Sequence, residues 1–253
     1  MKTALEVNNI TKIFNGSLDG QTIVALKNIN FKVYVNEFVT IVGPSGCGKT
    51  TLLNIIAGLI KPESGSISIN NNTVKGTCTC RALVFQECAL FPWKTALENI
   101  EFGLEIKGLQ KDERKKIAEQ KLKLVGLEGF GNCYPRQLSG GMKQKAQVAR
   151  ALALNPDILL LDEPFGSLDE ITRLRLDSEL LEIWEKEKKT VLLVTHSLEE
   201  ALLLSDRIIM FSAHPGEIRY ENRITELRPR DLFTPEIISL RKKLREQLMS
   251  CYQ

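Results

Sequence analysis

The feature that most constrains this sequence is a glycine-rich loop between an apolar run and a helix-forming run. Residues 43–50 fit the pattern G-x-x-x-x-G-K-[ST], in which successive backbone N–H groups converge on phosphate oxygens. Residues 38–42 before it are β-branched and apolar, as in a buried parallel strand, and residues 51–57 predict a helix that ends at Gly58. The sequence therefore predicts an α/β fold with a phosphate-binding turn between a strand and a helix.

Each part of this loop has a predicted role in binding a nucleotide. The helix N-terminus offers its positive dipole end, and Lys49 brings a mobile ammonium to the β- and γ-phosphates. Thr50 is predicted to place its hydroxyl on Mg²⁺. The alternative, a glycine-rich turn that matches by chance, is disfavoured by both flanking runs. The predicted nucleotide-binding residues here are Gly43, Pro44, Ser45, Gly46, Cys47, Gly48, Lys49, Thr50 and Thr51.

A second apolar run, residues 158–161, ends in the acidic pair Asp162 and Glu163. A buried parallel strand delivers such carboxylates to the sheet edge where ligands bind, so Asp162 is predicted to face the metal. Glu163 is predicted to accept a proton from an attacking water as a general base. Alone, the pair would indicate an ordinary solvated loop. With the phosphate loop upstream, the pair predicts hydrolysis of the nucleotide.

A third stretch, residues 138–144, opens a helix with Ser139 as its N-cap. Gly140 and Gly141 leave backbone N–H groups bare for a phosphate, which predicts a second anion site. One nucleotide reaches both this site and Lys49 only if two subunits face each other. The stretch therefore predicts a dimer with nucleotides at its interface.

Two further predicted strands end in polar residues, 84–86 in Gln86 and 191–196 in His196. By itself His196 would be read as an ordinary surface or core histidine. At the end of a parallel strand beside a phosphate site, we expect it to contact the γ-phosphate.

The order and spacing of these motifs resemble the ATP-binding subunits of ABC transporters over essentially the whole chain. The resemblance implies that residues 43–50 are Walker A, Gln86 the Q-loop, and residues 138–141 the signature motif. It makes Asp162 and Glu163 the Walker B pair.

The resemblance also assigns residues whose roles the patterns alone do not show. It implies that residues 167–169 form the D-loop, with Asp169 at the nucleotide site, and that His196 is the switch histidine. It gives Gln86 a place on the metal as well as in catalysis. Phe14 falls where the family has its adenine-stacking aromatic, although an aromatic in an N-terminal strand is as often a core residue.

The implied fold is an α/β P-loop NTPase of the ABC type, with a mainly parallel core sheet, an N-terminal antiparallel β region and a helical subdomain. The expected single domain, 1–253, divides into a catalytic core, a helical subdomain with the signature motif, and a C-terminal extension. These parts are residues 1–86 with 156–220, residues 87–155, and residues 221–253 respectively.

The implied function is ATP hydrolysis that energises an importer, with ATP and Mg²⁺ as cofactors. Expected partners are a second copy of the chain, two transmembrane permease subunits and, indirectly, an extracytoplasmic solute-binding protein. Residues 43–49, 91–95 and 215–218 resemble the nitrate, sulfonate and taurine class, which also includes subunits for pyrimidine-type vitamin precursors. Departures from the family are Ser167 for Ala, Ser197 for Asp, and Gln147 where the family has a small apolar residue.

Two alternatives belong to other functional classes. A non-transport ABC ATPase of translation or DNA repair would show tandem nucleotide domains or a long coiled-coil insertion, which the sequence lacks. A degenerate dimerisation module would have lost Glu163 or His196, and both are present.

Composition limits the location and partners of the chain. Its 253 residues carry a net charge of +3, so no basic excess indicates a nucleic-acid surface. Residues 1–6 do not form a secretory signal, and no apolar run approaches the ~18 residues that span a bilayer. We expect a peripheral protein on the cytoplasmic face of the membrane, attached through its partners.

Two smaller expectations concern cysteines and an aromatic segment. The six cysteines are expected to be reduced thiols, and Cys47, at a helix N-terminus near Lys49, is expected to have a lowered pKa. Residues 89–94 contain Phe91 and Trp93, which are either core residues or, as the resemblance implies, part of the groove that receives a membrane-subunit helix.

Overall fold

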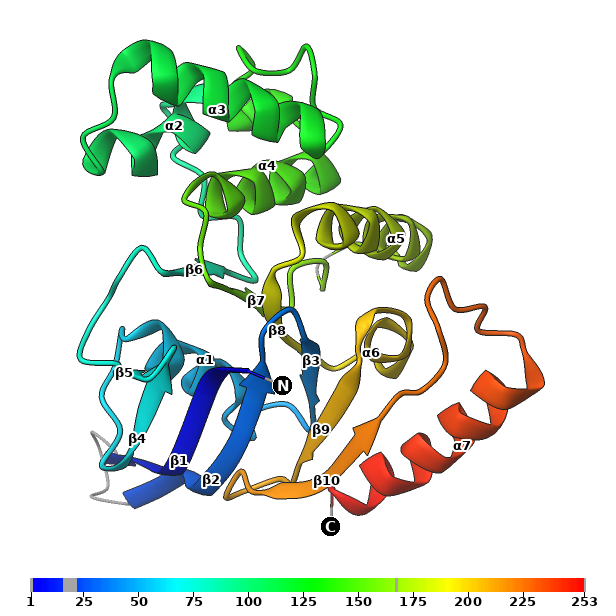
Figure 1. Cartoon of the computed structure of the whole chain (residues 1–253). Helices are drawn as coiled ribbons and strands as arrows, with labels where there is room; N and C mark the ends of the chain where they lie inside the picture. The colour runs from blue at the N-terminus through cyan, green and yellow to red at the C-terminus, as the bar shows by residue number, and fades with distance from the viewer. Residues whose placement is uncertain (1, 16–21, 167, 253) are drawn as a thin grey trace. The chain divides into compact units, whose positions relative to one another are not determined.

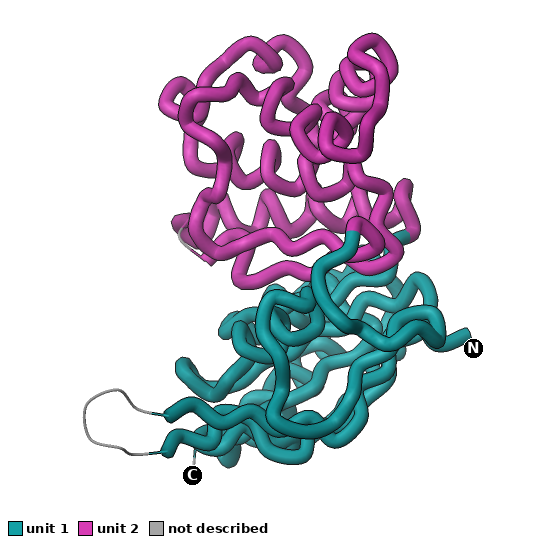
Figure 2. The backbone as a smooth tube through the Cα atoms, turned by 90° about the vertical axis from the view of Figure 1, so that its left-hand side faces the viewer, with its two compact units in different colours: residues 1–78, 189–253 teal, residues 79–188 magenta. Residues whose placement is uncertain are grey.

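The computed structural model describes residues 2–15, 22–166 and 168–252. The chain forms two compact units, coloured separately in Figure 2. Unit 1 contains Met1–Cys78 and Lys189–Gln253, and unit 2 contains Thr79–Lys188.

The first sheet of unit 1 is antiparallel, with the strand order β2-β1-β4-β5. Its strands are β1 (Thr3–Asn15), β2 (Thr22–Tyr34), β4 (Ser64–Ile69) and β5 (Asn72–Thr73). Along β2, Ile29, Phe31 and Val33 are buried while the residues between them are exposed, which is the period of two that one covered sheet face requires. The predicted antiparallel N-terminal region is confirmed.

The second group of strands in unit 1 runs in the order β10-β9-β3-β8. Strands β3 (Phe38–Val42), β8 (Thr190–Thr195) and β9 (Arg207–Phe211) are parallel, and β10 (Ile218–Arg223) pairs antiparallel with β9. All residues of β3, β8 and β9 are buried, which explains why their sequences are mostly apolar. The mainly parallel core sheet is therefore confirmed, with one antiparallel edge strand.

Helices α1 (Lys49–Ala57), α6 (Leu198–Leu204) and α7 (Pro235–Ser250) complete unit 1 (Figure 1). Helix α7 packs through an apolar stripe: Leu244 joins the cluster around Leu202 and Met210, with Leu240 and Leu248 against it. Arg230, in the chain before α7, donates to the carbonyls of Leu202 and Ser205. These bonds satisfy carbonyls at the C-terminal end of α6, and burial lowers the pKa of the Arg230 guanidinium to about 10.

Unit 2 pairs β6 (Arg81–Val84) in parallel with β7 (Ile158–Asp162). Its helices are α2 (Ala96–Ile106), α3 (Lys111–Leu124), α4 (Gly140–Ala153) and α5 (Glu170–Glu187), with a short 3-10 turn, η1 (Pro135–Gln137). Helices α2, α3 and α4 pack on one another, and α3 buries Ala118 and Leu122, four residues apart on one face (Figure 1). Among the described residues, no helix is long and apolar enough to cross a membrane.

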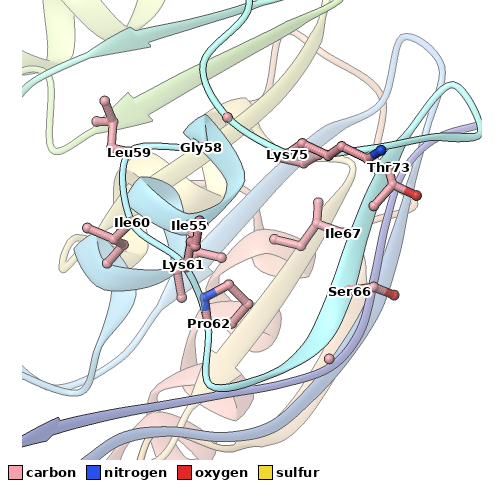
Figure 3. A pocket seen from close by; sticks show the side chains of 13 residues that line it. Ile55, Gly58, Leu59, Ile60, Lys61, Pro62, Ser66, Ile67, Thr73 and Lys75 are labelled. Atoms are coloured by element: carbon pink, nitrogen blue, oxygen red, sulfur yellow. The ribbon is translucent and has the colours of Figure 1, made fainter.

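A hollow of about 560 Å³ lies in unit 1 at the C-terminal end of α1 (Figure 3). Ile55 of α1 and Ile67 of β4 line it together with Leu59, Ile60 and Pro62. Ile55 lies six residues after Lys49 in α1, which at 1.5 Å per residue is roughly 9 Å along the helix from the glycine-rich loop. It is therefore distinct from the predicted phosphate site.

Two local expectations are wrong. The strand before Gln86 ends at Val84, and Phe85, which would extend it, is 40% exposed. Cys78 and Cys80 are disulfide-bonded, whereas all six thiols were expected to be reduced. A single intervening residue in a segment without regular structure brings the two sulfur atoms within bonding reach. Cys47, Cys88, Cys133 and Cys251 are free thiols, as expected.

Candidate functional site

The glycine-rich loop connects β3 to α1 in a conformation that requires glycine. Gly46 and Gly48 have φ values of 77° and 97°, in the left-handed region that side chains disfavour. A Cβ on Gly48 would also lie 2.7 Å from the carbonyl oxygen of Ala25. Position 48 therefore excludes a side chain for two independent reasons. Ala25, which it contacts, belongs to β2, so β2 packs against the loop.

Lys49 begins α1 and folds back over the loop. Its side chain is buried, and its Nζ donates to the carbonyls of Gly43 and Pro44 at 2.8 Å each. No described residue forms an ion pair with Lys49. The Nζ also lies 3.8 Å from Cys47 Sγ, so every hydrogen-bond partner of this buried ammonium is neutral. Such an ammonium favours an anion, because a charge removed from water needs a counter-charge.

Gly216, far from the glycine-rich loop in the sequence, packs against this loop, which the sequence analysis does not predict. Gly216 donates to Ala25 O at 3.1 Å and accepts from Lys27 N at 3.0 Å. A Cβ on Gly216 would lie 2.1 Å from Cys47 O, so only glycine fits against the loop. His214 is close as well, since a Cβ on Gly46 would be 3.5 Å from its Nε2. In the sequence, the Pro215-Gly216 pair is the signal for this contact, although by resemblance it indicates only the subfamily.

His196 directly follows β8 and is exposed. In the parallel register of β3 and β8, Val42 lies opposite Thr195. The residues that follow them, Gly43 and His196, therefore leave the same edge of the sheet. Unit 1 brings together the glycine-rich loop and the predicted switch histidine.

Phe14, near the end of β1, is 42% exposed. The Nζ of Lys12 lies 5.1 Å from the centroid of its ring. The alternative interpretation of Phe14 as a core residue is therefore wrong. An exposed ring beside a cation has the surface that stacking on a base requires.

In unit 2 the two parallel strands bring Gln86 to Glu163. Val84 of β6 pairs with Leu161 of β7, and both side chains emerge shortly after these partners. Gln86 Nε2 donates to Glu163 Oε2 at 3.4 Å, while Asp162, the last residue of β7, is buried.

The backbone at Glu163 is unusual. Its φ is 43°, a left-handed conformation that a residue with a side chain adopts at an energetic cost. Gly166 N donates to Glu163 O at 3.0 Å and closes the turn that imposes this conformation. The turn determines the direction in which the carboxylate leaves the strand.

The predicted signature residues form the N-terminal turn of α4. Ser139 is confirmed as the N-cap, and its Oγ accepts from Met142 N at 3.3 Å. A Cβ on Gly140 would lie 3.0 Å from Leu168 Cδ2, so this turn lies against the predicted D-loop. The D-loop prediction for Ser167 lies outside the described residues.

Asp169, also in the predicted D-loop, is the N-cap of α5. Its carboxylate accepts from Thr172 N at 3.0 Å, and the hydrogen bonds from Thr172 lower the pKa of the Asp169 carboxyl. Unit 2 thus brings together Gln86 with Glu163, and the signature turn with the D-loop.

The lowered pKa expected for the Cys47 thiol is wrong. The side chain is 0% exposed, and burial raises its pKa more than the nearby Lys49 lowers it. A helix N-terminus activates a thiol only where the thiolate is hydrated or paired, and here Gly216 and β2 cover the loop.

Alkylation should distinguish the two environments in the native protein. We expect a maleimide to modify the exposed Cys88 and to leave Cys47 unmodified, because the reagent needs a thiolate it can reach. Peptide mass spectrometry after timed labelling at pH 7 measures both residues. Both should react after unfolding in guanidinium, and rapid native labelling of Cys47 would contradict its burial.

Comparison with known proteins finds a matching family, similar sequences and a similar solved structure. Residues 26–166 match the family described as ABC transporter. An uncharacterized ABC transporter ATP-binding protein of Methanocaldococcus jannaschii is 53% identical over 96% of this chain and 91% of its own length. The taurine import ATP-binding protein of Pelagibacter ubique is 47% identical over 84% of this chain and 80% of its own. A solved dimeric ATP-binding cassette in a post-hydrolysis state, bound to ADP and phosphate, has a TM-score of 0.77 and 38% identity, and the match covers 88% of this chain and 100% of that one.

Proposed function

Because this chain belongs to the family of ABC transporter ATP-binding proteins, whose cassette hydrolyses ATP, we propose that it energises an importer of a small solute. The solute class is nitrate, a sulfonate, taurine or a similar small molecule. The taurine import relative, at 47% identity, supports this class. The protein would act at the cytoplasmic face of the membrane, bound to two permease subunits that a solute-binding protein serves.

The residues of the candidate site have separate roles in this proposal. Lys49 binds the β- and γ-phosphates with its ammonium, and Glu163 takes the proton of the attacking water. His196 contacts the γ-phosphate, while Phe14 stacks on the adenine. Gln86, hydrogen-bonded to Glu163 at 3.4 Å, orients that carboxylate and the water.

The proposed metal site fits Mg²⁺ by the chemistry of its donors. Thr50, Gln86 and Asp162 offer hydroxyl, amide and carboxylate oxygens, and Mg²⁺ is usually held by one or two carboxylates together with substrate phosphates. Among the described residues, no group of three or more His, Cys, Asp or Glu side chains forms a metal cage. When bound, the ion would neutralise charge on the phosphates.

Two copies of the chain are proposed to act together. The N-terminal turn of α4 presents Ser139, Gly140 and Gly141, which we assign to the nucleotide held by the partner's glycine-rich loop. The dimeric cassette structure bound to ADP and phosphate supports this arrangement. Residues 87–155 would serve as the helical subdomain that carries the signature motif.

The observation that carries the transport role is an aromatic surface on unit 2, formed by Phe91, Trp93 and Phe102. Trp93 is 70% exposed, so its interpretation as a core residue is wrong. The Phe91 ring lies 5.5 Å from the Trp93 ring and 4.7 Å from the Phe102 ring, measured between centroids. Phe91 and Phe102 are half-buried. A highly exposed tryptophan supported by two half-buried aromatics is typical of binding sites rather than of ordinary loops.

The loop that contains Phe91 and Trp93 is hydrogen-bonded to α2. Asn99, which is fully buried on α2, accepts from Phe91 N at 2.8 Å and donates to Phe91 O at 3.2 Å. Holding the backbone in place lowers the entropy lost when a partner binds. We therefore propose that the aromatic surface is the docking site for an apolar helical segment of a permease subunit.

Trp93→Ala should weaken assembly with the permease and abolish solute uptake. Truncating an aromatic anchor typically costs at least about 2 kcal/mol, which is roughly 30-fold in affinity. Nucleotide affinity and melting temperature of the isolated subunit should stay unchanged, because Trp93 is exposed. Co-purification with the permease subunits and uptake of nitrate, taurine and alkanesulfonates measure the effect.

Phe233→Ala is the matched control, since Phe233 is 83% exposed but lies in unit 1. It should assemble and transport like the wild type. A Trp93→Ala subunit that still assembles and transports would refute the docking surface. Loss of stability of that variant in isolation would show that Trp93 is a packing residue.

A further inference from the structure

Two buried glutamines on α4 connect the signature helix to the segment after Gln86. Gln144 is 3% exposed and Gln147 is 1% exposed. They lie three residues apart, so they share one face of the helix. Buried amides are costly unless hydrogen-bonded, and Gln147 stands where the family resemblance predicts a small apolar residue. Its polarity therefore needs an explanation in this chain.

The two side chains close a ring of hydrogen bonds onto residues 86–89. Ala89 N donates to Gln147 Oε1 at 3.0 Å, Gln147 Nε2 to Gln144 Oε1 at 2.6 Å, and Gln144 Nε2 to Gln86 O at 3.3 Å. The series of hydrogen bonds begins at the N–H of Ala89, which can only donate, and ends at the carbonyl of Gln86, which can only accept. These ends determine the orientation of both amides, so each part of the ring depends on the others.

The same helix also binds the other polar group of Ala89. Arg150 donates to Ala89 O at 2.8 Å, and its guanidinium carbon lies 5.7 Å from the centroid of the Phe91 ring. Residues 85–91 contain no helix or strand that would hold them. The side chains of α4 therefore take the place of secondary structure in this segment.

We propose that Gln147 is a positioning residue that makes the segment after Gln86 and the signature helix one rigid piece. Gln147 is buried, and it acts by keeping the backbone of residues 86–89 in place. Gln86 then stays beside Glu163, and the aromatic surface moves together with Ser139. The inference rests on the role proposed above for Gln86. Misplacement of a catalytic group by about 1 Å is enough to cost up to 10²-fold in rate.

The test uses Gln147→Met in the full chain, because methionine keeps the length of the side chain and removes its hydrogen bonds. Hydrogen exchange of the Ala89 amide should accelerate at least about tenfold, while exchange in β7 stays unchanged. The kcat for ATP hydrolysis should fall about tenfold, with KM for ATP within twofold, since the glycine-rich loop is unaffected. Gln120→Met, at an exposed position of α3, is the control and should change neither quantity.

A double variant tests whether the two glutamines act as one unit. Gln144→Met with Gln147→Met should lower kcat no further than either single change, because both break the same ring. Losses that multiply would overturn the proposal, as would wild-type protection of Ala89 in Gln147→Met. Accelerated exchange throughout unit 2 with a lowered melting temperature would show a packing role instead. These measurements need no permease, so they are independent of the importer assignment.

Discussion

Glu163→Gln should lower the rate of ATP hydrolysis by about 10²–10⁴-fold while leaving ATP binding intact. The amide accepts no proton from the attacking water, which removes the general base. It also removes the negative charge that repels the γ-phosphate, so ATP should remain bound and a dimer should accumulate. Steady-state phosphate release and gel-filtration mass with ATP and Mg²⁺ measure the two effects.

The control for this variant is Glu182→Gln, which changes an exposed glutamate of α5 in the same unit. It should hydrolyse ATP like the wild type. Glu163 also has a left-handed backbone, and glutamine keeps a side chain of the same size, so the turn should persist. Wild-type hydrolysis by Glu163→Gln would show that the base is another group.

Lys49→Met should weaken nucleotide binding strongly. Loss of a hydrogen bond to a charged group costs about 1.5–3 kcal/mol, which is roughly 10- to 150-fold in affinity. The ammonium is buried and donates to Gly43 O, Pro44 O and the Cys47 thiol, all of them neutral, so phosphate oxygens would supply the negative charge that it lacks. Binding of a fluorescent ATP analogue, followed at constant ionic strength, measures the loss.

Lys61→Met is its control, because Lys61 is an exposed lysine shortly after α1. It should bind the analogue like the wild type, which excludes a general effect of net charge. The melting temperature of each variant separates binding from folding. Unchanged affinity in a folded Lys49→Met protein would refute the assignment of residues 43–50 as the phosphate-binding loop.

The parts of the site that local patterns define could be predicted from the sequence. Gly43, Glu163 and His196 each directly follow a strand that is mostly apolar and buried along its whole length, as strands of a parallel sheet are. The N-cap at Ser139 could be predicted as well, because its hydrogen bond joins residues only three positions apart. These features depend on neighbours in sequence.

The sequence by itself determined the ABC cassette fold, the order of the motifs and the residue types of the nucleotide site. Only the tertiary structure decided that Gly216 covers Cys47 O, that burial raises the Cys47 pKa, and that Trp93 is exposed. It also decided that Gln147 bonds the backbone of Ala89. The physical reason is that burial and desolvation depend on residues far apart in sequence. The periodicity of one segment predicts that segment's own shape, but not the segment that will cover it.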